Sequence, residues 1–469
     1  MPIRVLMLCC RENAGNILGC LVGQPDVSVN YCPGIEEFRS RLEDECFDLI
    51  VVDQVKQSKP GTAFVRDIHQ RQSAAMIVLI WLPGALTVRK RLREAPWCRT
   101  LSHPAPPCEI QREIDQLRVR MASGGQGERT QIVTPGFPPF LVGEHSRMLM
   151  LKDALLKAAS SDLPVLMFSE PGCGKELAAN AVHYLSPRRE FAFARVLCST
   201  YSEEALDRRL FGSLRDSGGR APGIEPGYMD TADRGTLLLD MVDALGPGTQ
   251  ARLLRVLEEK TFERIGGSET MTCDVRFVFS TTTDLHARAH DGRFGEDLYY
   301  RLSALVIVVP PLRDRKTDIA LLARHFVKKH CILQHYPELA AKESFLDALH
   351  RNDWHGNVRE LENVIERAII LGGGKDLSRE HLPTYVKQPD EATPFPPARV
   401  QEYPVAFKIA RRQFEREFLT MALAKYKANI SHTAGAIGIT RRNLQIKIKQ
   451  LSIEVERLKR RDSPGEVSA

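Results

Sequence analysis

The sequence predicts a multidomain α/β protein that ends in a small all-helical domain. The chain has 469 residues, which is more than one hydrophobic core usually serves. Through most of its length, short apolar runs alternate with helical stretches, a pattern typical of parallel sheets flanked by helices. After residue 404 the strand-like runs stop and the apolar spacing becomes helical. We therefore expect two α/β domains followed by a helical one.

The composition is that of a globular protein and not of a membrane protein, a secreted protein or a disulfide-bonded scaffold. The chain is 43% apolar and 26% charged, as is usual for globular domains. It contains no run of roughly 20 apolar residues, the length of a membrane span, and its N-terminus lacks the pattern of a secretory signal. Its 11 cysteines are scattered without CxxC pairs, which favours reduced thiols. These features predict a cytoplasmic protein without a membrane partner.

Two segments rich in Gly and Pro interrupt the periodic apolar pattern. They cover residues 121–139 and 388–404, and such compositions are typical of linkers. We expect them to separate three domains, which are residues 1–120, 140–387 and 405–461.

The first domain is predicted to contain a parallel, doubly wound sheet. Apolar runs at Ile3–Leu8, Leu49–Val52 and Met76–Ile80 have the length and composition of buried strands. The segment Gly34–Leu42 between two of them has helical spacing. This βα alternation indicates helices on both faces of the sheet.

Asp53 follows one of these strands, and the arrangement resembles the receiver domain of response regulators. In receivers such an aspartate accepts a phosphoryl group. The resemblance also requires an acidic pair after the first strand and a lysine near the fifth, but Cys9-Cys10 and His103 stand there. An isolated Asp at a strand end often only caps a turn. We therefore expect a degenerate receiver in which Asp53 is a vestigial phosphoacceptor. The domain would instead serve dimerisation or sense another signal.

The second domain contains a glycine-rich turn between a strand and a helix. The apolar run Pro164–Phe168 leads into Ser169–Glu176, whose sequence is SEPGCGKE. Backbone N–H groups of such a turn bind phosphate, and a lysine such as Lys175 adds positive charge. The motif is imperfect, because Ser169 replaces its first Gly and Glu176 stands where Ser or Thr would meet magnesium. A strand-to-helix turn without a ligand is the alternative.

Seven further motifs follow in one order: Leu210-Phe211-Gly212, Gly235–Asp240, Gln250–Leu257, Phe262–Gly267, Asp297–Leu302, Pro310–Arg313 and Trp354–Leu361. With the glycine-rich turn, they make the chain from Val142 to about Val386 resemble the AAA+ sigma-54 interaction domain of NtrC-class transcriptional regulators. The resemblance implies an α/β core with a helical lid that binds ATP or ADP with Mg²⁺, which Asp240 would hold through water. The implied nucleotide-binding residues are Val142, Gly143, Gly172, Cys173, Gly174, Lys175, Glu176, Asp240, Arg301 and Arg359.

The sequence departs from this family at the positions that support hydrolysis. The family has Asp-Glu where this chain has Asp240-Met241, and methionine cannot act as the general base, which is worth roughly 10²–10⁴-fold in rate. Thr282 stands at the first sensor, and Gly295 stands at the first arginine finger. The loop that contacts sigma-54 is replaced by Asp216–Ala221, with the sequence DSGGRA. We predict nucleotide binding with little hydrolysis; rescue by Asp243 is the alternative.

Two secondary hypotheses concern the surroundings of the glycine-rich turn. Some NtrC-class regulators with similarly altered motifs bind cyclic di-guanylate through basic residues near this turn, and Arg188, Arg189 and Glu190 are the corresponding candidates. The segment Phe137–Phe140 lacks the arginine that those relatives use. The second hypothesis is a thiol switch at Cys173, because the pKa of a thiol tends to fall at a helix N-terminus; a small residue that merely fits the loop is the alternative.

The C-terminal domain has the pattern of a helix-turn-helix. Helices are predicted at Phe414–Tyr426, Ser431–Ile437 and Arg441–Leu451. From residue 441 to residue 461 there are eight Lys or Arg and two Glu. The segment resembles the Fis-type domain that ends NtrC-class proteins, which binds double-stranded DNA as a dimer. The expected inner face is Ala434, Ile439, Leu444 and Ile448, and the expected DNA-binding residues are Thr440, Arg441, Arg442, Asn443, Gln445, Lys447 and Lys449.

Two functions follow from these patterns. The favoured one is a sequence-specific transcriptional regulator that uses its AAA+ domain for assembly or sensing and works with the housekeeping RNA polymerase holoenzyme. The alternative is an ATP-hydrolysing activator that depends on sigma-54. In both, the chain is expected to self-associate, as a dimer up to a hexamer.

Overall fold

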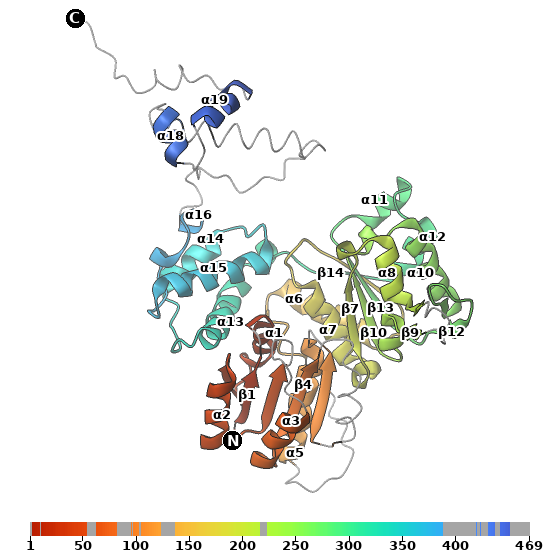
Figure 1. Cartoon of the computed structure of the whole chain (residues 1–469), viewed down its shortest axis with the longest axis horizontal. Coiled ribbons are helices and arrows are strands. Elements are labelled where there is room, and N and C mark those ends of the chain that lie inside the picture. The colour runs from red at the N-terminus through yellow and green to blue at the C-terminus, as the bar shows by residue number, and fades with distance from the viewer. Residues whose placement is uncertain are drawn as a thin grey trace, which may run out of the picture. The chain divides into compact units, whose positions relative to one another are not determined.

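The computed structural model describes residues 2–9, 11–53, 62–81, 95, 97–102, 105–122, 137–215, 223–387, 419, 423, 430–436 and 441–450. The chain divides into two compact units, Met1–Asp390 and Glu391–Ala469. The first unit contains both α/β domains and the second contains the C-terminal helices (Figure 1). Among the described residues, no helix is long and apolar enough to cross a membrane.

The first domain is a five-stranded parallel sheet in the order β2-β1-β3-β4-β5. Its strands are β1 (Ile3–Leu8), β2 (Val27–Cys32), β3 (Leu49–Asp53), β4 (Met76–Trp81) and β5 (Cys98–Ser102), and its helices are α1 (Arg11–Leu21), α2 (Ile35–Asp44), α3 (Thr62–Arg71) and α5 (Pro107–Ala122). The order is that of doubly wound, receiver-like domains. Separate apolar clusters pack on the two faces of the sheet. The predicted sheet is therefore confirmed.

The second domain has its own five-stranded parallel sheet, in the order β14-β6-β13-β10-β7. The strands are β6 (Val165–Phe168), β7 (Phe193–Leu197), β10 (Thr236–Asp240), β13 (Arg276–Thr281) and β14 (Leu305–Val308). The middle strands are apolar and buried on both faces, as a sheet covered by helices requires. In this order β13 lies between the strand before the glycine-rich turn and the strand that ends at Asp240.

Helices and two small hairpins surround this sheet. The helices of the core are α6 (Ser146–Ala159), α7 (Lys175–Leu185), α8 (Glu203–Phe211), α9 (Tyr228–Thr231), α10 (Pro247–Glu259), α11 (Leu285–His290) and α12 (Glu296–Leu302). The hairpins pair β8 (Ser213–Arg215) with β9 (Gly223–Glu225), and β11 (Thr261–Glu263) with β12 (Thr270–Thr272). The edge strand β14 exposes Val306 and Val308, with exposed fractions of 55% and 59%.

A helical lid follows the sheet and is drawn in cyan to blue in Figure 1. It consists of α13 (Asp318–Leu333), α14 (Glu343–Arg351), α15 (Asn357–Gly372) and α16 (Thr384–Lys387). These helices bury an apolar core of their own that includes Trp354, whose side chain is fully buried. The lid predicted from the family resemblance is thus present.

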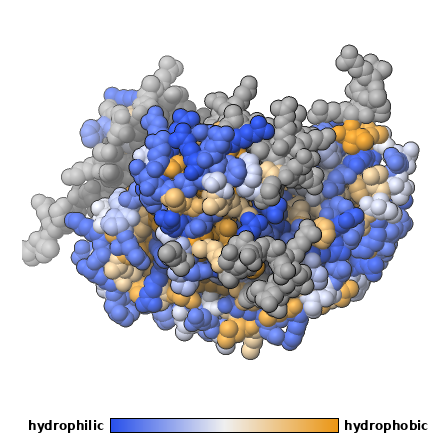
Figure 2. Space-filling model, turned by 90° about the horizontal axis from the view of Figure 1, so that it is seen from below, coloured by the Kyte–Doolittle hydropathy of each residue, from blue (hydrophilic) through white to orange (hydrophobic). Residues whose placement is uncertain are grey.

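The first domain packs against both parts of the second. Helix α1 contacts α13 of the lid, and α5 contacts α7 of the core. Cys20 and Cys108 from the first domain lie in the apolar cluster of the second, and the Tyr184 hydroxyl donates to Asp115. Helix α5 extends to Ala122, two residues into the predicted linker. Figure 2 shows apolar and hydrophilic residues interspersed over one face of the molecule.

The second unit contains α18 (Ile430–Ala436) and α19 (Arg441–Gln450). Its small core consists of Leu419, Leu423, Ala434 and Leu444, with Ile430 and Ile448 partly buried against it. The predicted inner face is confirmed at Ala434, Leu444 and Ile448, because all three join this core. Ile439 and Thr440 lie outside the described residues.

Candidate nucleotide-binding site

The glycine-rich turn connects β6 to α7, as the sequence predicts. Gly172 and Gly174 have φ angles of +80° and +104°, in the left-handed region that favours glycine. At Gly172 a Cβ atom would lie 2.2 Å from the carbonyl oxygen of Gly356, so a side chain has no room. Helix α7 begins at Lys175. The free N–H groups of its first turn therefore lie beside the turn, where they can bind phosphate.

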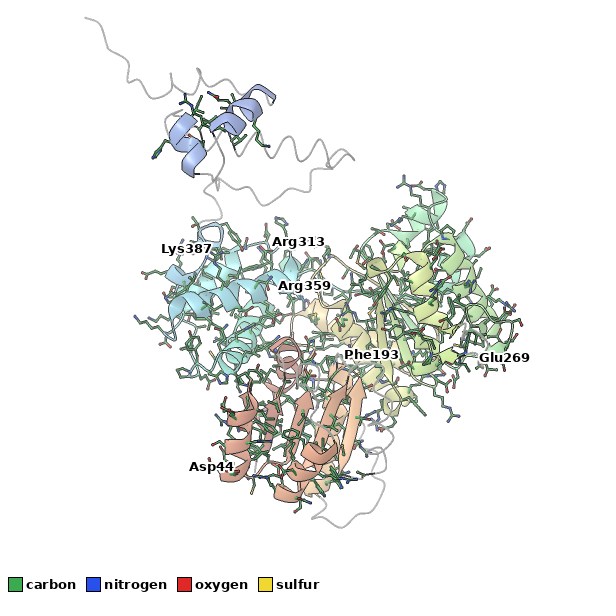
Figure 3. All side chains as sticks on the ribbon, viewed as in Figure 1. Asp44, Phe193, Glu269, Arg313, Arg359 and Lys387 are labelled. Carbon is green, nitrogen blue, oxygen red and sulfur yellow. The ribbon has the colours of Figure 1, made fainter. Side chains whose placement is uncertain are left out.

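The lid holds this turn from the other side. The Nη1 atom of Arg313 lies 2.7 Å from the Oε2 atom of Glu170. The buried Asn357 amide donates to Glu170 at 3.2 Å and to the carbonyl of Pro171 at 3.1 Å. Figure 3 shows Arg359 of the lid and Arg313, which precedes the lid in sequence, near one another on the side that faces the sheet. The segment Trp354–Leu361 thus positions the phosphate loop.

Three of the predicted nucleotide-binding residues lie at the junction of core and lid. Val142 packs against the apolar core of the lid. A Cβ atom at Gly143, whose φ is +148°, would lie 2.8 Å from the Oδ2 atom of Asp318. Arg359 lines a groove together with Gly172 and Gly356. The structure therefore brings these predicted nucleotide-binding residues to the core, the lid and the turn between them.

Lys175 is half-buried beside the turn. Burial lowers the pKa of Lys175, the nearby Asp240 opposes this shift, and Arg359 adds to it. Burial and the positive charge of Arg359 both disfavour the ammonium form of Lys175 when it has no partner. An anionic ligand would compensate for both effects and would therefore be stabilised at this point. The electrostatics agree with a phosphate site.

Asp240 ends β10 and is held by two neighbours. Its Oδ1 atom accepts a hydrogen bond from the hydroxyl of Ser280, and its Oδ2 atom lies 2.7 Å from the Nη2 atom of Arg195. Burial acts to raise the pKa of Asp240, but hydrogen bonds from Ser280 and Arg195 outweigh it, so the pKa lies below its ordinary value. Strands β13 and β7 flank β10, which explains how these two residues reach one carboxylate. The sequence singled out neither of them.

Arg195 also binds the acid in the phosphate loop. Its Nη1 atom lies 2.7 Å from the Oε2 atom of Glu176, so one guanidinium joins Glu176 to Asp240. In phosphate-loop proteins the residues at these two positions hold Mg²⁺. Here both are bound to a cation of the chain itself, and the residues do not fit a magnesium ion in this arrangement. The expected role of Asp240 as a magnesium ligand through water stays a prediction.

Met241 occupies the position that follows Asp240. Its backbone is left-handed, with φ of +59°, and its N–H donates to the Ser280 hydroxyl at 3.3 Å. The alternative base, Asp243, accepts from the Thr281 hydroxyl at 3.0 Å, and its other oxygen lies 3.3 Å from Arg288. Both oxygens of Asp243 are therefore engaged within the fold.

The second unit presents a candidate DNA-binding helix. Arg441 and Gln445 on α19 are exposed and Lys447 is half-buried, while Leu444 faces the small core. Arg442, Asn443 and Lys449 lie on the same helix. Exposed basic and amide side chains such as those of Arg441 and Gln445 suit phosphates and base edges.

Comparisons with known proteins identify the three parts of the chain. Residues 141–308 match the sigma-54 interaction domain, residues 313–396 the AAA+ ATPase lid domain, and residues 410–451 the Fis family of bacterial regulatory proteins. The regulatory protein AtoC of Escherichia coli is 37% identical over 67% of this chain and 68% of its own length. The transcriptional regulatory protein ZraR of Escherichia coli is 30% identical over 87% of this chain and 90% of its own.

The chain belongs to the NtrC family of transcriptional regulators. Its fold is also that of NtrX from Brucella abortus, whose crystal structure has a TM-score of 0.52 with 24% identity and covers 97% of this chain and 100% of that one. The structure of NtrX in complex with ATP is 25% identical, with a TM-score of 0.51 and the same coverage. The predicted family and fold are therefore confirmed.

Several family positions can now be located in this NtrC-family chain. Arg301 is exposed on α12, and its guanidinium donates to the Leu257 carbonyl at 3.3 Å. Gly295 precedes α12, and its N–H donates to Gln250 at 2.8 Å. The segment Asp216–Ala221 lies outside the described residues, between the strands of the β8–β9 hairpin. Thr282 follows β13, but the hydroxyls that contact the acids of the site belong to Ser280 and Thr281.

The residues proposed for a cyclic dinucleotide have other partners. The Arg188 guanidinium lies 2.9 Å from Asp162 and 2.7 Å from Asp274. Arg189 lies 3.5 Å from Glu190. Arg188 thus joins neighbouring segments of the core.

Cys173 and Asp53 are both buried. Burial raises the pKa of the Cys173 thiol, so the expectation of a lowered pKa at the helix N-terminus was wrong; the thiol is only 3% exposed. Asp53 is 4% exposed and accepts a hydrogen bond from Asn13 at 2.6 Å. Cys9 is also buried, and Cys10 and His103 lie outside the described residues.

Proposed function

We propose that this NtrC-family regulator binds specific DNA, and that its AAA+ domain binds ATP or ADP for assembly or sensing and hydrolyses it slowly. The observation that carries the proposal is the pair Asp240-Met241. Methionine has no group that accepts a proton from water, and Asp243 is engaged by Thr281 and Arg288. Loss of general-base assistance costs roughly 10²–10⁴-fold in rate.

Nucleotide binding is supported independently of hydrolysis. The turn at Gly172 and Gly174, the start of α7 and the half-buried Lys175 form a phosphate site. NtrX, which shares the fold over 97% of this chain, has been crystallised in complex with ATP. A ligand that binds only the folded, assembled chain stabilises that state by mass action, so nucleotide can act without being consumed.

DNA binding and self-association complete the proposal. The Fis-family match and the basic helix α19 support a dimer on a two-fold DNA site. The exposed Val306 and Val308 on edge strand β14 offer an apolar surface for a second copy of the chain. An RNA polymerase holoenzyme is the proposed target of the assembled regulator. We keep residues 1–120, 140–387 and 405–461 as its domains.

A second candidate function is ATP-driven activation of polymerase that carries sigma-54. The match of residues 141–308 to the sigma-54 interaction domain favours it, as does the similarity to AtoC and ZraR. Membership of the family supports this second function more strongly than it supports the first. Met241 and the DSGGRA segment, in contrast, favour the first proposal.

Open-complex formation by purified polymerase separates the two functions. The full chain is first used to select a DNA site from random duplexes. This site is then placed upstream of a promoter for sigma-54 and of a promoter for the housekeeping sigma factor. Permanganate footprinting then detects melted DNA with ATP or with a non-hydrolysable analogue. We expect the regulator to act with both nucleotides and with the housekeeping sigma factor. Melting that requires both sigma-54 and hydrolysable ATP would establish the second function instead.

A further inference from the structure

We propose that Arg195 takes the place of the magnesium ion in this site, so that the chain binds nucleoside di- and triphosphates without a divalent cation. The proposal deepens the nucleotide-binding function proposed above and rests on it. It concerns the ligand class and its recognition: the free polyphosphate and not its magnesium complex.

The position of the guanidinium is the first argument. Its two terminal nitrogens each lie 2.7 Å from a carboxylate oxygen, one in Glu176 and one in Asp240. Glu176 is in the first turn of α7 and Asp240 ends β10. In phosphate-loop proteins a magnesium ion joins the residues at these two positions. Arg195 therefore spans the gap that the ion would occupy.

The second argument is that both oxygens of Asp240 and one oxygen of Glu176 already have partners. The other oxygen of Asp240 accepts the Ser280 hydroxyl, so both of its oxygens are engaged. A divalent cation would have to break the charge-assisted bonds to Arg195 and then lie next to a permanent positive charge. The two carboxylates are balanced by Arg195 and Lys175. The site thus has no surplus negative charge to attract an ion.

The third argument is the remaining capacity of Arg195. Its Nε atom is buried and has no hydrogen-bond partner, while the side chain as a whole is 32% exposed. A guanidinium has five N–H donors in one plane, a geometry that suits phosphate oxygens. Arg195 can therefore bind both acids and still face a ligand. Together with Lys175 it supplies two cationic side chains that can contact a polyphosphate.

Equilibrium binding with and without magnesium tests the proposal. The probe is ADP that carries an N-methylanthraniloyl label, titrated with the full chain in excess EDTA and in excess magnesium chloride. We expect the two dissociation constants to agree within about threefold. Binding that is at least about tenfold tighter with magnesium would overturn the proposal.

The Arg195→Ala variant supplies the converse result. Without the guanidinium, Glu176 and Asp240 become available to an ion, and we expect binding that weakens at least about tenfold in EDTA and recovers with magnesium. Electron paramagnetic resonance of added Mn²⁺ provides a readout that does not depend on affinity. We expect bound Mn²⁺ in the complex of Arg195→Ala with labelled ADP and none in the native complex; bound Mn²⁺ in the native complex would contradict the proposal.

Two controls keep the outcome decisive. Arg255→Ala removes an exposed arginine that pairs with Glu259 and Glu263 at 2.8 and 2.9 Å, and it is expected to bind like the native chain. Arg195→Gln keeps a polar side chain of intermediate length without the charge; it replaces Arg195→Ala if that variant melts at a lower temperature. Absence of binding by the native chain in both buffers would refute the nucleotide-binding function itself, a result distinct from magnesium-dependent binding.

Discussion

The sulfur of Met241 lies 3.6 Å from the hydroxyl oxygen of Ser199, which donates to it. Met241 directly follows Asp240 and so stands where hydrolytic members of this family have their glutamate. A thioether is only a weak acceptor and cannot hold a proton from the attacking water. The hydrogen bond from Ser199 thus gives the Met241 side chain a polar partner within the site.

Met241→Glu is predicted to raise ATP turnover by at least about tenfold, because a general base contributes roughly 10²–10⁴-fold. The gain should be larger in the Arg195→Ala background, where Asp240 is released from its ion pair. Steady-state phosphate release at saturating ATP measures the change. Met241→Gln, which has similar size but no basic group, is the control. An equal gain from both variants would exclude the general-base explanation.

Asn357→Ala is predicted to loosen the lid from the phosphate loop. The buried amide oxygen accepts the Leu312 N–H at 2.8 Å, and the amide nitrogen donates to Glu170 and Pro171. Leaving buried polar groups without partners costs about 1–3 kcal/mol each. We expect a lower urea midpoint and weaker binding of labelled ADP. Asn352→Ala, which removes a bond to the Asp353 N–H near the surface, should change neither; similar losses in both variants would contradict this role.

Arg441 and Lys447 are predicted to affect DNA binding in different ways. Arg441 is exposed at the start of α19, and its replacement by Ala should cost about 1–3 kcal/mol on the selected site and relax its specificity. Lys447→Ala should weaken binding to all sequences and reduce the slope of log affinity against log salt by about 1. Fluorescence anisotropy with selected and scrambled duplexes measures both. A uniform effect of Arg441→Ala on both duplexes would assign it to phosphate instead.

His183 is predicted to make the second domain sensitive to acid. Burial, together with Arg112 and Arg276, lowers the pKa of His183 from 6.5 to about 3, and its Nδ1 atom lies 2.8 Å from the Thr236 hydroxyl. The neutral form is favoured on folding, so this stabilisation is complete above pH 6.5. It is lost as the pH falls toward the folded pKa, by about 1.4 kcal/mol per pH unit.

Urea unfolding at neutral pH and at about pH 5 checks this expectation, because the second pH lies between the unfolded and folded pKa values of His183. The native midpoint should fall more than that of His183→Gln. The matched control is His290→Gln, since the side chain of His290 is 86% exposed and this change should leave the pH dependence unaltered. An acid sensitivity that persists in His183→Gln would assign the effect to other groups.

The strands and the phosphate loop could be predicted from the sequence because their signals are local. Apolar runs such as Leu49–Val52 need only the length and composition of a buried strand, and glycines at 172 and 174 report the backbone of the turn. The pair Asp240-Met241 was likewise visible as a departure from the family motif.

The contacts around Asp240 could not be predicted, because they depend on which strands are neighbours. Arg195 and Ser280 are far from Asp240 in sequence and meet it only because β7 and β13 flank β10. The expectation for Cys173 was wrong for a similar reason: parts of the chain far away in sequence pack against the turn, such as Gly356 of the lid and Arg315, which donates to the Cys173 carbonyl at 3.2 Å. Burial then outweighs the helix N-terminus in setting the pKa.

ATP turnover over a range of protein concentrations, measured with equilibrium nucleotide binding on the same samples, tests the central claim most directly. The range is needed because assembly could complete a site with Arg301 of a neighbouring copy. We predict saturable binding with turnover far slower than about once per second, the lower end of typical enzyme rates, at every concentration. Turnover near once per second in the assembled state would contradict the account and would indicate an ATP-driven activator instead.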